Sequence, residues 1–332
     1  MEIAVDRRDS VDLTVITVCY NARAALPGCV DSIAPLLRSD DLQVEYLVID
    51  GASEDGTREF LRERQSRGDI SRFVSEPDQG IYDAMNKGIS MASGRVTVFI
   101  NADDEICSEA VADCCRPILE GKARFTLASS ELLGAGRLPC GILRPDLSKS
   151  LLGACCCHQS LYCETELLRE FGGFDFREFP LIADAALMTR FFASVIPYEV
   201  VQRVASRFLL GGASAAASVH LEGLRLLLRN REDILAAAGR DSAVARNALR
   251  EIYRYALRWL RFGNGEFPTP VIQGIHRIVG ELLSSMPVGQ RKGWLRHARV
   301  KRAEARFLKA VVPGKFGRKQ GLICEVFDLM LP

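Results

Sequence analysis

The first hundred residues alternate short apolar runs, rich in β-branched side chains, with segments whose apolar residues recur at helical spacing. Four runs have the composition of buried strands: residues 13–18, 44–49, 70–74 and 96–100. Two segments between them have apolar residues every three or four positions: Leu26, Val30, Ile33 and Leu37 in the first, and Ile81, Ala84, Met85 and Ile89 in the second. Strands that alternate with helices in this way form a parallel sheet covered by helices. We therefore expect an α/β fold.

The rest of the chain divides by pattern. With 332 residues, of which 48% are hydrophobic, the chain can form a large packed core. Beyond residue 220, Leu and Arg alternate in a helical pattern. We predict an α/β domain at residues 1–215 with a mostly parallel, Rossmann-like sheet flanked by helices. A helical, basic C-terminal region should follow at 216–332.

The cysteines and the apolar segments indicate the cellular compartment of the protein and whether it spans a membrane. The chain has eleven cysteines but no basic segment followed by an apolar one at its N-terminus, so we expect free thiols in a reducing, cytoplasmic compartment. The run 155–158, with Cys163 nearby, gives a weak zinc hypothesis, because zinc ligands are usually spaced as separated pairs. No uninterrupted apolar stretch reaches the roughly 20 residues that span a bilayer. We expect a soluble or peripheral protein.

Polar residues cluster where three of the predicted strands end. They lie at Tyr20-Asn21, at 50–57 and at 101–105. Open α/β sheets bind ligands at the carboxyl ends of their strands, so these three loops should form one site. Asp50 can accept hydrogen bonds from a base N–H or a ribose hydroxyl, although acids are also common in turns. Ser53 is equally consistent with a helix cap and with a ligand contact.

Two familiar nucleotide-binding motifs are disfavoured. The loop from Cys19 to Arg23 has no glycine, so it cannot form the turn that brings a dinucleotide pyrophosphate close to the backbone. The loop at 50–57 has glycines but lacks the lysine with which a P-loop reaches the terminal phosphates. A nicotinamide dehydrogenase and an ATPase or GTPase are therefore poor hypotheses.

Two further groups of charged residues have an ordinary and a functional interpretation. Asp83 and Lys87 lie one helical turn apart, which is typical of an exposed ion pair and also suits a ligand contact. The acidic segment from Asn101 to Glu105 follows an apolar strand directly. It could cap a helix, or it could hold a hard divalent cation that also takes phosphate oxygens.

Four motifs, taken in order, resemble the family 2 glycosyltransferases of the GT-A fold: VITVCYN, EYLVIDGASEDGT, SEPDQGIYDAMNKGI and GRVTVFINADDEI. The resemblance covers about residues 12–215, and the chain is similar to bacterial exopolysaccharide glycosyltransferases of the colanic-acid type. It implies transfer of a sugar from a nucleoside-diphosphate sugar to an acceptor hydroxyl, with inversion and with a Mg or Mn ion. By resemblance, a set of residues would contact the donor: Thr17, Tyr20, Asn21, Asp50, Ser53, Asp78, Gly80, Asp83, Lys87, Asn101 and Asp103.

The resemblance also implies a metal site and a base. Asp103 and Asp104 would serve the metal and the diphosphate, whereas Asn101 stands where the family usually has Asp. The family's catalytic base falls on Asp184, in a helix predicted at 182–194, without the neighbouring acids that many relatives carry. An acid at a helix N-terminus would be the ordinary interpretation. His158 and Arg190 are second-rank candidates for ligand contact.

The C-terminal segment 291–319 holds eleven Lys or Arg against one acid, Glu304. It could form a basic amphipathic helix on an anionic membrane, at the inner face of the cytoplasmic membrane. A solvated helix face or a phosphate-binding surface would give the same pattern, although we expect no nucleic acid partner. Membrane contact favours a saccharide or lipid-linked saccharide acceptor, as in polysaccharide or glycolipid assembly.

Two alternatives to a transferase can be compared with the sequence. A nucleotide-sugar pyrophosphorylase would need a glycine-rich first loop followed by Arg and Lys, which is missing. A nucleotide-sugar-binding partner that has lost catalysis and works in a membrane-associated assembly stays open, because of Asn101 and the alanines that flank Asp184.

Overall fold

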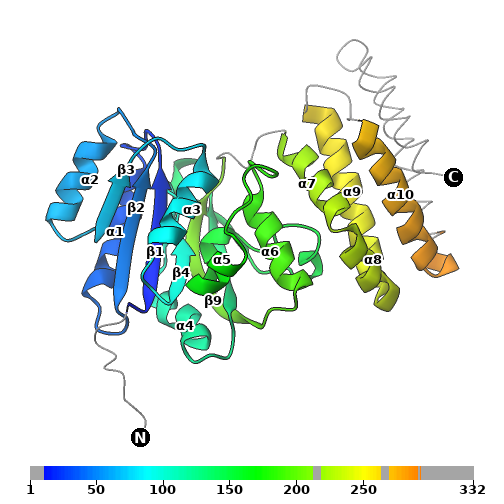
Figure 1. Ribbon diagram of the computed structural model, residues 1–332, viewed down its shortest axis with the longest axis horizontal. Helices are drawn as coiled ribbons and strands as arrows, with labels where there is room; N and C mark the ends of the chain where they lie inside the picture. The colour runs from blue at the N-terminus through cyan, green and yellow to red at the C-terminus, as the bar shows by residue number, and fades with distance from the viewer. Residues whose placement is uncertain (1–10, 212–217, 263–268, 291, 293–332) are drawn as a thin grey trace, which may run out of the picture. The chain divides into compact units, whose positions relative to one another are not determined.

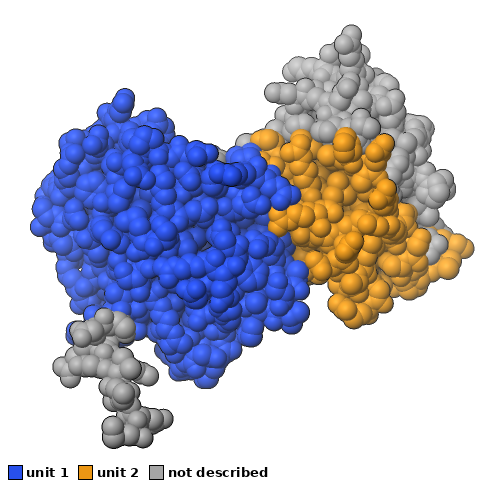
Figure 2. Space-filling view, in the orientation of Figure 1, with its two compact units in different colours: residues 1–147, 154–212 blue, residues 148–153, 213–332 orange. Residues whose placement is uncertain are grey.

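The computed structural model describes residues 11–211, 218–262, 269–290 and 292, and a single sheet with its covering helices fills the first part of the chain (Figure 1). Residues 1–147 and 154–212 form one compact unit, and residues 148–153 and 213–332 form a second (Figure 2). The division at 212/213 lies close to the predicted one at 215/216. The sequence did not indicate that the short segment 148–153 belongs with the second unit.

Four strands form the parallel part of the sheet, in the order β3, β2, β1, β4: Arg72–Ser75, Val44–Asp50, Leu13–Cys19 and Val96–Phe99. Their β-branched and aromatic side chains suit a sheet that is covered on both faces. The register pairs Cys19 with Asp50 and Asp50 with Ser75. The carboxyl ends of three neighbouring strands are therefore level, and their last side chains meet.

The sheet continues through four more strands in the order β8, β6, β9, β5, with β7 beside β6: Leu161–Glu164, Phe125–Leu133, Tyr198–Leu209, Glu105–Ile106 and Pro139–Leu143. Strand β8 is antiparallel to both β4 and β6, and β7 is antiparallel to β6. The predicted α/β class is confirmed, with parallel pairing among the first four strands and between β6 and β9, whereas β5, β7 and β8 pair with their neighbours in antiparallel fashion. The short connection from β6 to β7 permits only an antiparallel hairpin.

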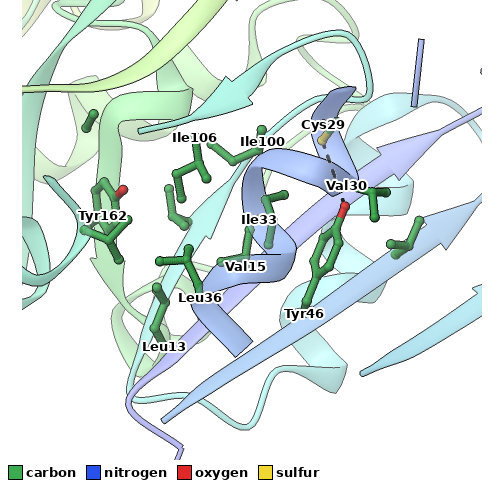
Figure 3. Packing of buried hydrophobic residues seen from close by; sticks show 14 of the residues in the cluster. Leu13, Val15, Cys29, Val30, Ile33, Leu36, Tyr46, Ile100, Ile106 and Tyr162 are labelled. Atoms are coloured by element: carbon green, nitrogen blue, oxygen red, sulfur yellow. Dashed lines mark hydrogen bonds between the residues drawn. The ribbon is translucent and has the colours of Figure 1, made fainter. Parts of the chain in front are cut away.

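Helices cover both faces of the sheet. Side chains from α1 (Leu26–Ile33), α2 (Thr57–Ser66) and α4 (Ser108–Leu119) share one apolar core with β1 and β2. Figure 3 shows this core, in which the hydroxyl of Tyr46 contacts the thiol of Cys29. On the other face, α3 (Ile81–Met91) packs on β1 through Gly88, where an added Cβ would lie 2.7 Å from Ile16. The α3 helix also contacts α5 (Thr165–Glu170).

Two predicted elements have different bounds. The helical pattern at 26–37 is split into α1 and the 3₁₀ helix η2 (Ala34–Arg38), because Pro35 has no N–H to continue the α-helix. The strand expected at 70–74 begins later, as β3, and Ile70 contributes a buried side chain from the preceding turn. Three further 3₁₀ turns follow along the chain: Ala135–Arg137 (η3), Leu147–Lys149 (η4) and His158–Ser160 (η5). Turn η4 contains the division between the two units, at 147/148.

The second unit is helical, as the pattern beyond residue 220 predicts. It contains α7 (Ser218–Arg229), α8 (Arg231–Arg240), α9 (Ser242–Phe262) and α10 (Thr269–Ser285). These helices share a core that includes Leu227, Leu249 and Ile278, and Leu152 from the segment 148–153 adds to it. None of the helices in the described residues is long and apolar enough to cross a membrane. The predicted basic helix at 291–319 lies outside the described residues, except for Lys292.

Candidate active site

Asp50 is the buried anchor of the site's first wall. It ends β2, is 0% exposed, and accepts hydrogen bonds from the backbone N–H of Ser53 (3.0 Å), the hydroxyl of Ser53 and the hydroxyl of Ser75 (2.6 Å). The thiol of Cys19 lies 3.6 Å from the same carboxylate, and burial raises the pKa of that thiol, so it stays a donor. Asp50 therefore braces the loop at 51–56.

This loop is joined to the loop that follows β1. Asn21 has a left-handed φ of 48°, a conformation that Asn tolerates better than most residues. Its N–H donates to the Ser53 hydroxyl (2.7 Å), and its side-chain oxygen accepts from the N–H of Glu54 (3.0 Å). The N–H of Arg23 donates to Asp55 (3.0 Å). The two loops, predicted to share one site, thus form a continuous wall.

Two side chains, those of Tyr20 and Asp78, converge beside Gly51 of this wall. A Cβ added to Gly51 would lie 2.6 Å from Oδ2 of Asp78 and 3.3 Å from the ring of Tyr20. The Tyr20 side chain is 67% exposed, and Asp78 is half-buried with its Oδ1 accepting from the N–H of Gly80 (2.9 Å). An aromatic face and a carboxylate oxygen beside a glycine can stack on a flat ring and accept hydrogen bonds from its hydroxyl or N–H groups.

Other members of the predicted donor set have different neighbours. Thr17 is fully buried and its hydroxyl accepts from Tyr46 (3.1 Å), so it faces the core.

Asp83 accepts from the N–H of Gln79 (3.0 Å) at the start of α3. The ammonium of Lys87 donates to the carbonyl of Pro77 (2.7 Å) and pairs with Glu76 (2.9 Å). The ordinary interpretation of Asp83 and Lys87 as an ion pair with each other was therefore wrong, because Lys87 reaches back to the loop before its helix.

The two acids of the acidic segment have opposite environments. Asp104 is 1% exposed and accepts from the side chain of Gln159 (2.5 Å) and the N–H of Leu209 (2.9 Å). Asp103 is half-buried; its carbonyl accepts from Arg137 (3.0 Å), and its carboxylate makes no hydrogen bond with any described residue. Asp104 therefore braces the segment, while Asp103 has oxygens available to a ligand.

These acids can be compared with the needs of a divalent cation. Among the described residues, no group of three His, Cys, Asp or Glu side chains is arranged to hold a metal ion. Mg²⁺ in nucleotide sites usually takes one or two carboxylates and completes its shell with waters and substrate phosphates. The free carboxylate of Asp103 fits that arrangement, whereas Asp104, predicted as its partner, already uses its oxygens within the protein.

Asp184 lies in the first turn of α6 (Ala183–Ala193). Its Oδ1 accepts from the hydroxyl of Tyr82 (2.8 Å) and the N–H of Ala185 (2.8 Å), and its Oδ2 contacts Nδ1 of His158 (3.1 Å). Burial raises the pKa of Asp184, but the hydrogen bond and charge of His158, with the other two donors, outweigh burial and hold the pKa below its ordinary value. This carboxylate is ionised at neutral pH and lies in the protein's own hydrogen-bond network.

The two second-rank candidates differ in position. His158 contacts Asp184 on one side and, at 3.4 Å, the side-chain oxygen of Asn101 on the other. Arg190 donates to the carbonyl of Phe171 (2.9 Å) and stacks on the Phe171 ring, and it lines a surface pocket with Asn86 and Phe174. His158 thus joins the acidic segment to Asp184, while the Arg190 contacts described are with the loop before α6.

Sequence reasoning missed several residues that hold the site together: Ser75, Tyr82, Arg137 and Gln159. Tyr82 and Ser75 lie inside the quoted motif SEPDQGIYDAMNKGI, which assigned them no role, and Gln159 directly follows the second-rank candidate His158. The Cys155-to-His158 run has no zinc-like arrangement, since Cys155 and Cys156 are buried and His158 faces Asn101 and Asp184.

Similarity to known proteins agrees with this arrangement. The family described as "Glycosyl transferase family 2" matches residues 14–134. An uncharacterized glycosyltransferase of Mycobacterium tuberculosis is 30% identical over 184 residues, which is 54% of this chain and 68% of the relative. A "PGL/p-HBAD biosynthesis glycosyltransferase" of Mycobacterium bovis is 27% identical over 183 residues, covering 54% of this chain and 70% of the relative.

Solved structures agree in fold. The S. aureus TarS 1–349 complex with UDP-GlcNAc has a TM-score of 0.56 at 15% identity, covering 96% of this chain and 90% of that one. A longer TarS chain is covered over 49% of its length. The mannosyltransferase PcManGT of Pyrobaculum calidifontis, in complex with GDP-Man and Mn²⁺, has a TM-score of 0.51 at 15% identity, covering 99% of this chain and 88% of that one.

The sheet, the loops at its strand ends and these similarities define a nucleotide-sugar-dependent transferase with a GT-A type fold. This chain belongs to the family 2 glycosyltransferases.

Burial of Asp104 gives a testable pH dependence. Burial raises the pKa of Asp104 from 3.8 to about 7, and although the Leu209 N–H opposes this, the nearby charge of Asp103 adds to it. The folded protein therefore favours the protonated acid, so this contribution to stability is fully present below about pH 4 and is lost as the pH rises through 7. Asp104→Asn should stabilise the metal-free protein by about 2 to 4 kcal/mol at pH 8, and by much less at pH 4.

Denaturant unfolding at the two pH values measures this difference. The Asn amide can donate to Oε1 of Gln159, a buried atom without a hydrogen-bond partner, once the Gln159 amide turns over. Asp175→Asn, at an exposed position, is the matched control and should change little at either pH. A gain for Asp104→Asn that is equal at both pH values would contradict the assignment.

Proposed function

We propose that this glycosyltransferase transfers a sugar from a nucleoside-diphosphate sugar to an acceptor hydroxyl with inversion, with Asp184 as the base. The observation that carries the proposal is the hydrogen-bonded carboxylate of Asp184, 17% exposed, which one imidazole connects to the acidic segment. In the proposed step the acceptor oxygen bonds to the anomeric carbon as the bond to the diphosphate oxygen breaks. The acceptor's proton passes to Asp184, and a single displacement inverts the carbon.

The nucleoside would lie between Tyr20 and Asp78, over Gly51. Support comes from the exposed Tyr20 ring and from Oδ2 of Asp78, which has no donor among the described residues and can accept from a ribose hydroxyl or a base N–H. Asp50 was expected to make this contact directly. With both of its oxygens bound to Ser53, Ser75 and Cys19, its proposed role is to hold the shape of this pocket.

The diphosphate would lie at the acidic segment, with a divalent cation held by Asp103. PcManGT was solved with GDP-Man and Mn²⁺, and the carboxylate of Asp103 has no hydrogen bond to any described residue, so a Mg or Mn ion suits this position. Such an ion would neutralise the charge that develops on the departing diphosphate. We assign Asp104 the role of fixing the segment, because its carboxylate is buried and accepts from Gln159 and Leu209.

A nucleotide-sugar-binding partner without catalysis is the second candidate. It is favoured by one departure from the family, Asn101, which removes a charge from the segment that would hold the metal. This candidate predicts donor binding without turnover, so the comparison of wild type with an Asp184 variant separates the two.

Replacing the base tests the main proposal. Asp184→Ala should lower kcat about 100-fold to 10,000-fold, because the acceptor proton loses its acceptor, while donor affinity stays within about threefold of wild type. Nucleotide release from a panel of nucleoside-diphosphate sugars measures kcat, and calorimetry measures donor binding. The control Asp175→Ala removes an exposed acid that follows Phe174 and should leave both unchanged. A wild-type protein that binds donor and never turns over would favour the non-catalytic candidate.

The metal proposal predicts unequal effects along the acidic segment. Asp103→Asn should raise the Mg²⁺ or Mn²⁺ concentration for half-maximal activity at least about 10-fold, because the ion loses its charged ligand. Asn101→Ala should raise it less, since only an amide is lost. Activity measured against metal concentration decides between them, and equal shifts for the two variants would refute the assignment to Asp103.

We also propose that the segment 291–319 contacts an anionic membrane and brings the enzyme to a lipid-linked acceptor at the inner face of the cytoplasmic membrane. Its eleven cationic side chains support this. A chain that ends at residue 290 should lose most of its binding to vesicles containing anionic lipid in a sedimentation assay. Neutral vesicles serve as the control, and unchanged binding of the shortened chain would disprove the proposal.

A further inference from the structure

Three side chains from separate parts of the chain meet, with His158 between the other two. Asn101 follows β4, His158 begins η5, and Asp184 lies at the start of α6. The imidazole of His158 lies between the other two, with Nδ1 at 3.1 Å from Oδ2 of Asp184 and Nε2 at 3.4 Å from Oδ1 of Asn101. His158 and Asp184 are 13% and 17% exposed, so these contacts are partly shielded from water.

The carboxylate fixes which atom of His158 donates. An ionised carboxylate only accepts hydrogen bonds, so Nδ1 of His158 must carry the proton that faces Asp184. Oδ1 of Asp184 already accepts from Tyr82 and from the Ala185 N–H, whereas His158 is the described donor to Oδ2. Oδ2 therefore keeps room to accept a further proton, and His158 determines where that oxygen lies.

The other side of the ring requires a versatile partner. With Nδ1 as donor, Nε2 of a neutral imidazole is an acceptor, whereas Nε2 of an imidazolium is a second donor. The amide of Asn101 offers both an oxygen and an NH₂ group, so by turning over it can pair with either form. An aspartate at this position could only accept, and it would add a second negative charge beside the ring.

Gln159, the residue after His158, contacts the acidic segment three residues beyond Asn101, at Asp104. Gln159 donates to Asp104 (2.5 Å), and Ser160 donates to the carbonyl of Ser129 (2.9 Å), which fixes η5 to β6. His158 and Gln159 thus contact Asn101 and Asp104, the first and last residues of the segment Asn101–Asp104. Asp103 lies between these two contacts, and its carboxylate makes no hydrogen bond within the described part of the chain.

We infer that His158 is a positioning residue that sets the base and the donor-binding segment at a fixed distance, with Nδ1 holding Asp184 and Nε2 holding Asn101. This rests on the proposed function, in which Asp184 is the base and the acidic segment binds the donor diphosphate. The inference gives Asn101 the role of pairing with His158. It predicts that the contact made by Nδ1 affects kcat and that the contact made by Nε2 affects donor KM.

Two substitutions separate these ends. The amide nitrogen of Asn lies about as far from the backbone as Nδ1 of His, and that of Gln about as far as Nε2. His158→Asn can therefore keep the donor to Asp184 while losing the link to Asn101, and His158→Gln can keep the link while losing the donor. We expect His158→Gln to lower kcat about 100-fold with a donor KM within about threefold of wild type. His158→Asn should raise donor KM about 10-fold with a much smaller loss in kcat.

The measurement is steady-state nucleotide release, with thermal unfolding of each variant to confirm folding. Asn101→Ala removes the partner of Nε2 and should raise donor KM as much as His158→Asn does. The double variant that combines His158→Asn with Asn101→Ala should raise donor KM little more than either single change. Similar losses in both constants for His158→Asn and His158→Gln, unaltered constants for both, or additive effects in the double variant would each overturn the inference. If a His158 variant does not fold, the Asn101→Ala effect on KM against kcat decides alone.

The base assignment is tested separately. If Asp184→Ala stays active, the proposed function fails, whereas the coupling between His158 and Asn101 in donor KM can still be measured. If Asp184→Ala is inactive and the two His158 variants do not differ, only the present inference fails.

Discussion

The parallel pairing of β1 with β2 and β4 is the constraint on which the rest of this enzyme depends. Its register pairs Cys19 with Asp50, and Asp50 with Ser75 of β3, so that side chains from loops far apart in sequence come within hydrogen-bond distance. A slip of one residue would move every side chain of a strand to the other face. The buried carboxylate of Asp50 then fixes the loop at 51–56, and that loop fixes Asn21. The wall formed by the loops after β1 and β2 is therefore a consequence of strand register.

Much of this arrangement could be predicted from the sequence because it depends on local pattern. The alternation of strands and helices predicted the α/β class, and the polar residues at strand ends predicted that the loops after β1 and β2 meet. The strands β6, β7 and β8 were not predicted, and the pairing of β8 with β4 and β6 depends on contacts between segments that are distant in the chain. Residue roles were harder still. Asp50 and Asp104 were chosen as ligand contacts by residue type, but both are buried acceptors within the protein, and burial is a property of the whole fold.

His158 illustrates a different limit of sequence reasoning. A single histidine carries no pattern, and its significance arises only when β4, η5 and α6 bring Asn101 and Asp184 to its two ring nitrogens. The same holds for Tyr82, which lies on α3 and donates to a carboxylate about a hundred residues away in the chain. A motif can place such residues in a list, but the geometry shows which atoms they serve. The departure from the family at Asn101 likewise gains a physical meaning from its neighbour.

The segment 148–153 has a consequence for the order in which the chain can fold. Leu152 packs in the helical core with residues from α7 to α10. Because Leu152 is translated before these helices, its side chain cannot pack until they have been synthesised. Contacts of this sequence separation slow folding and delay the completion of a unit. His158 follows this segment within a few residues. The stretch of chain that leads to His158 thus reaches its final state only after α7 to α10 have been translated.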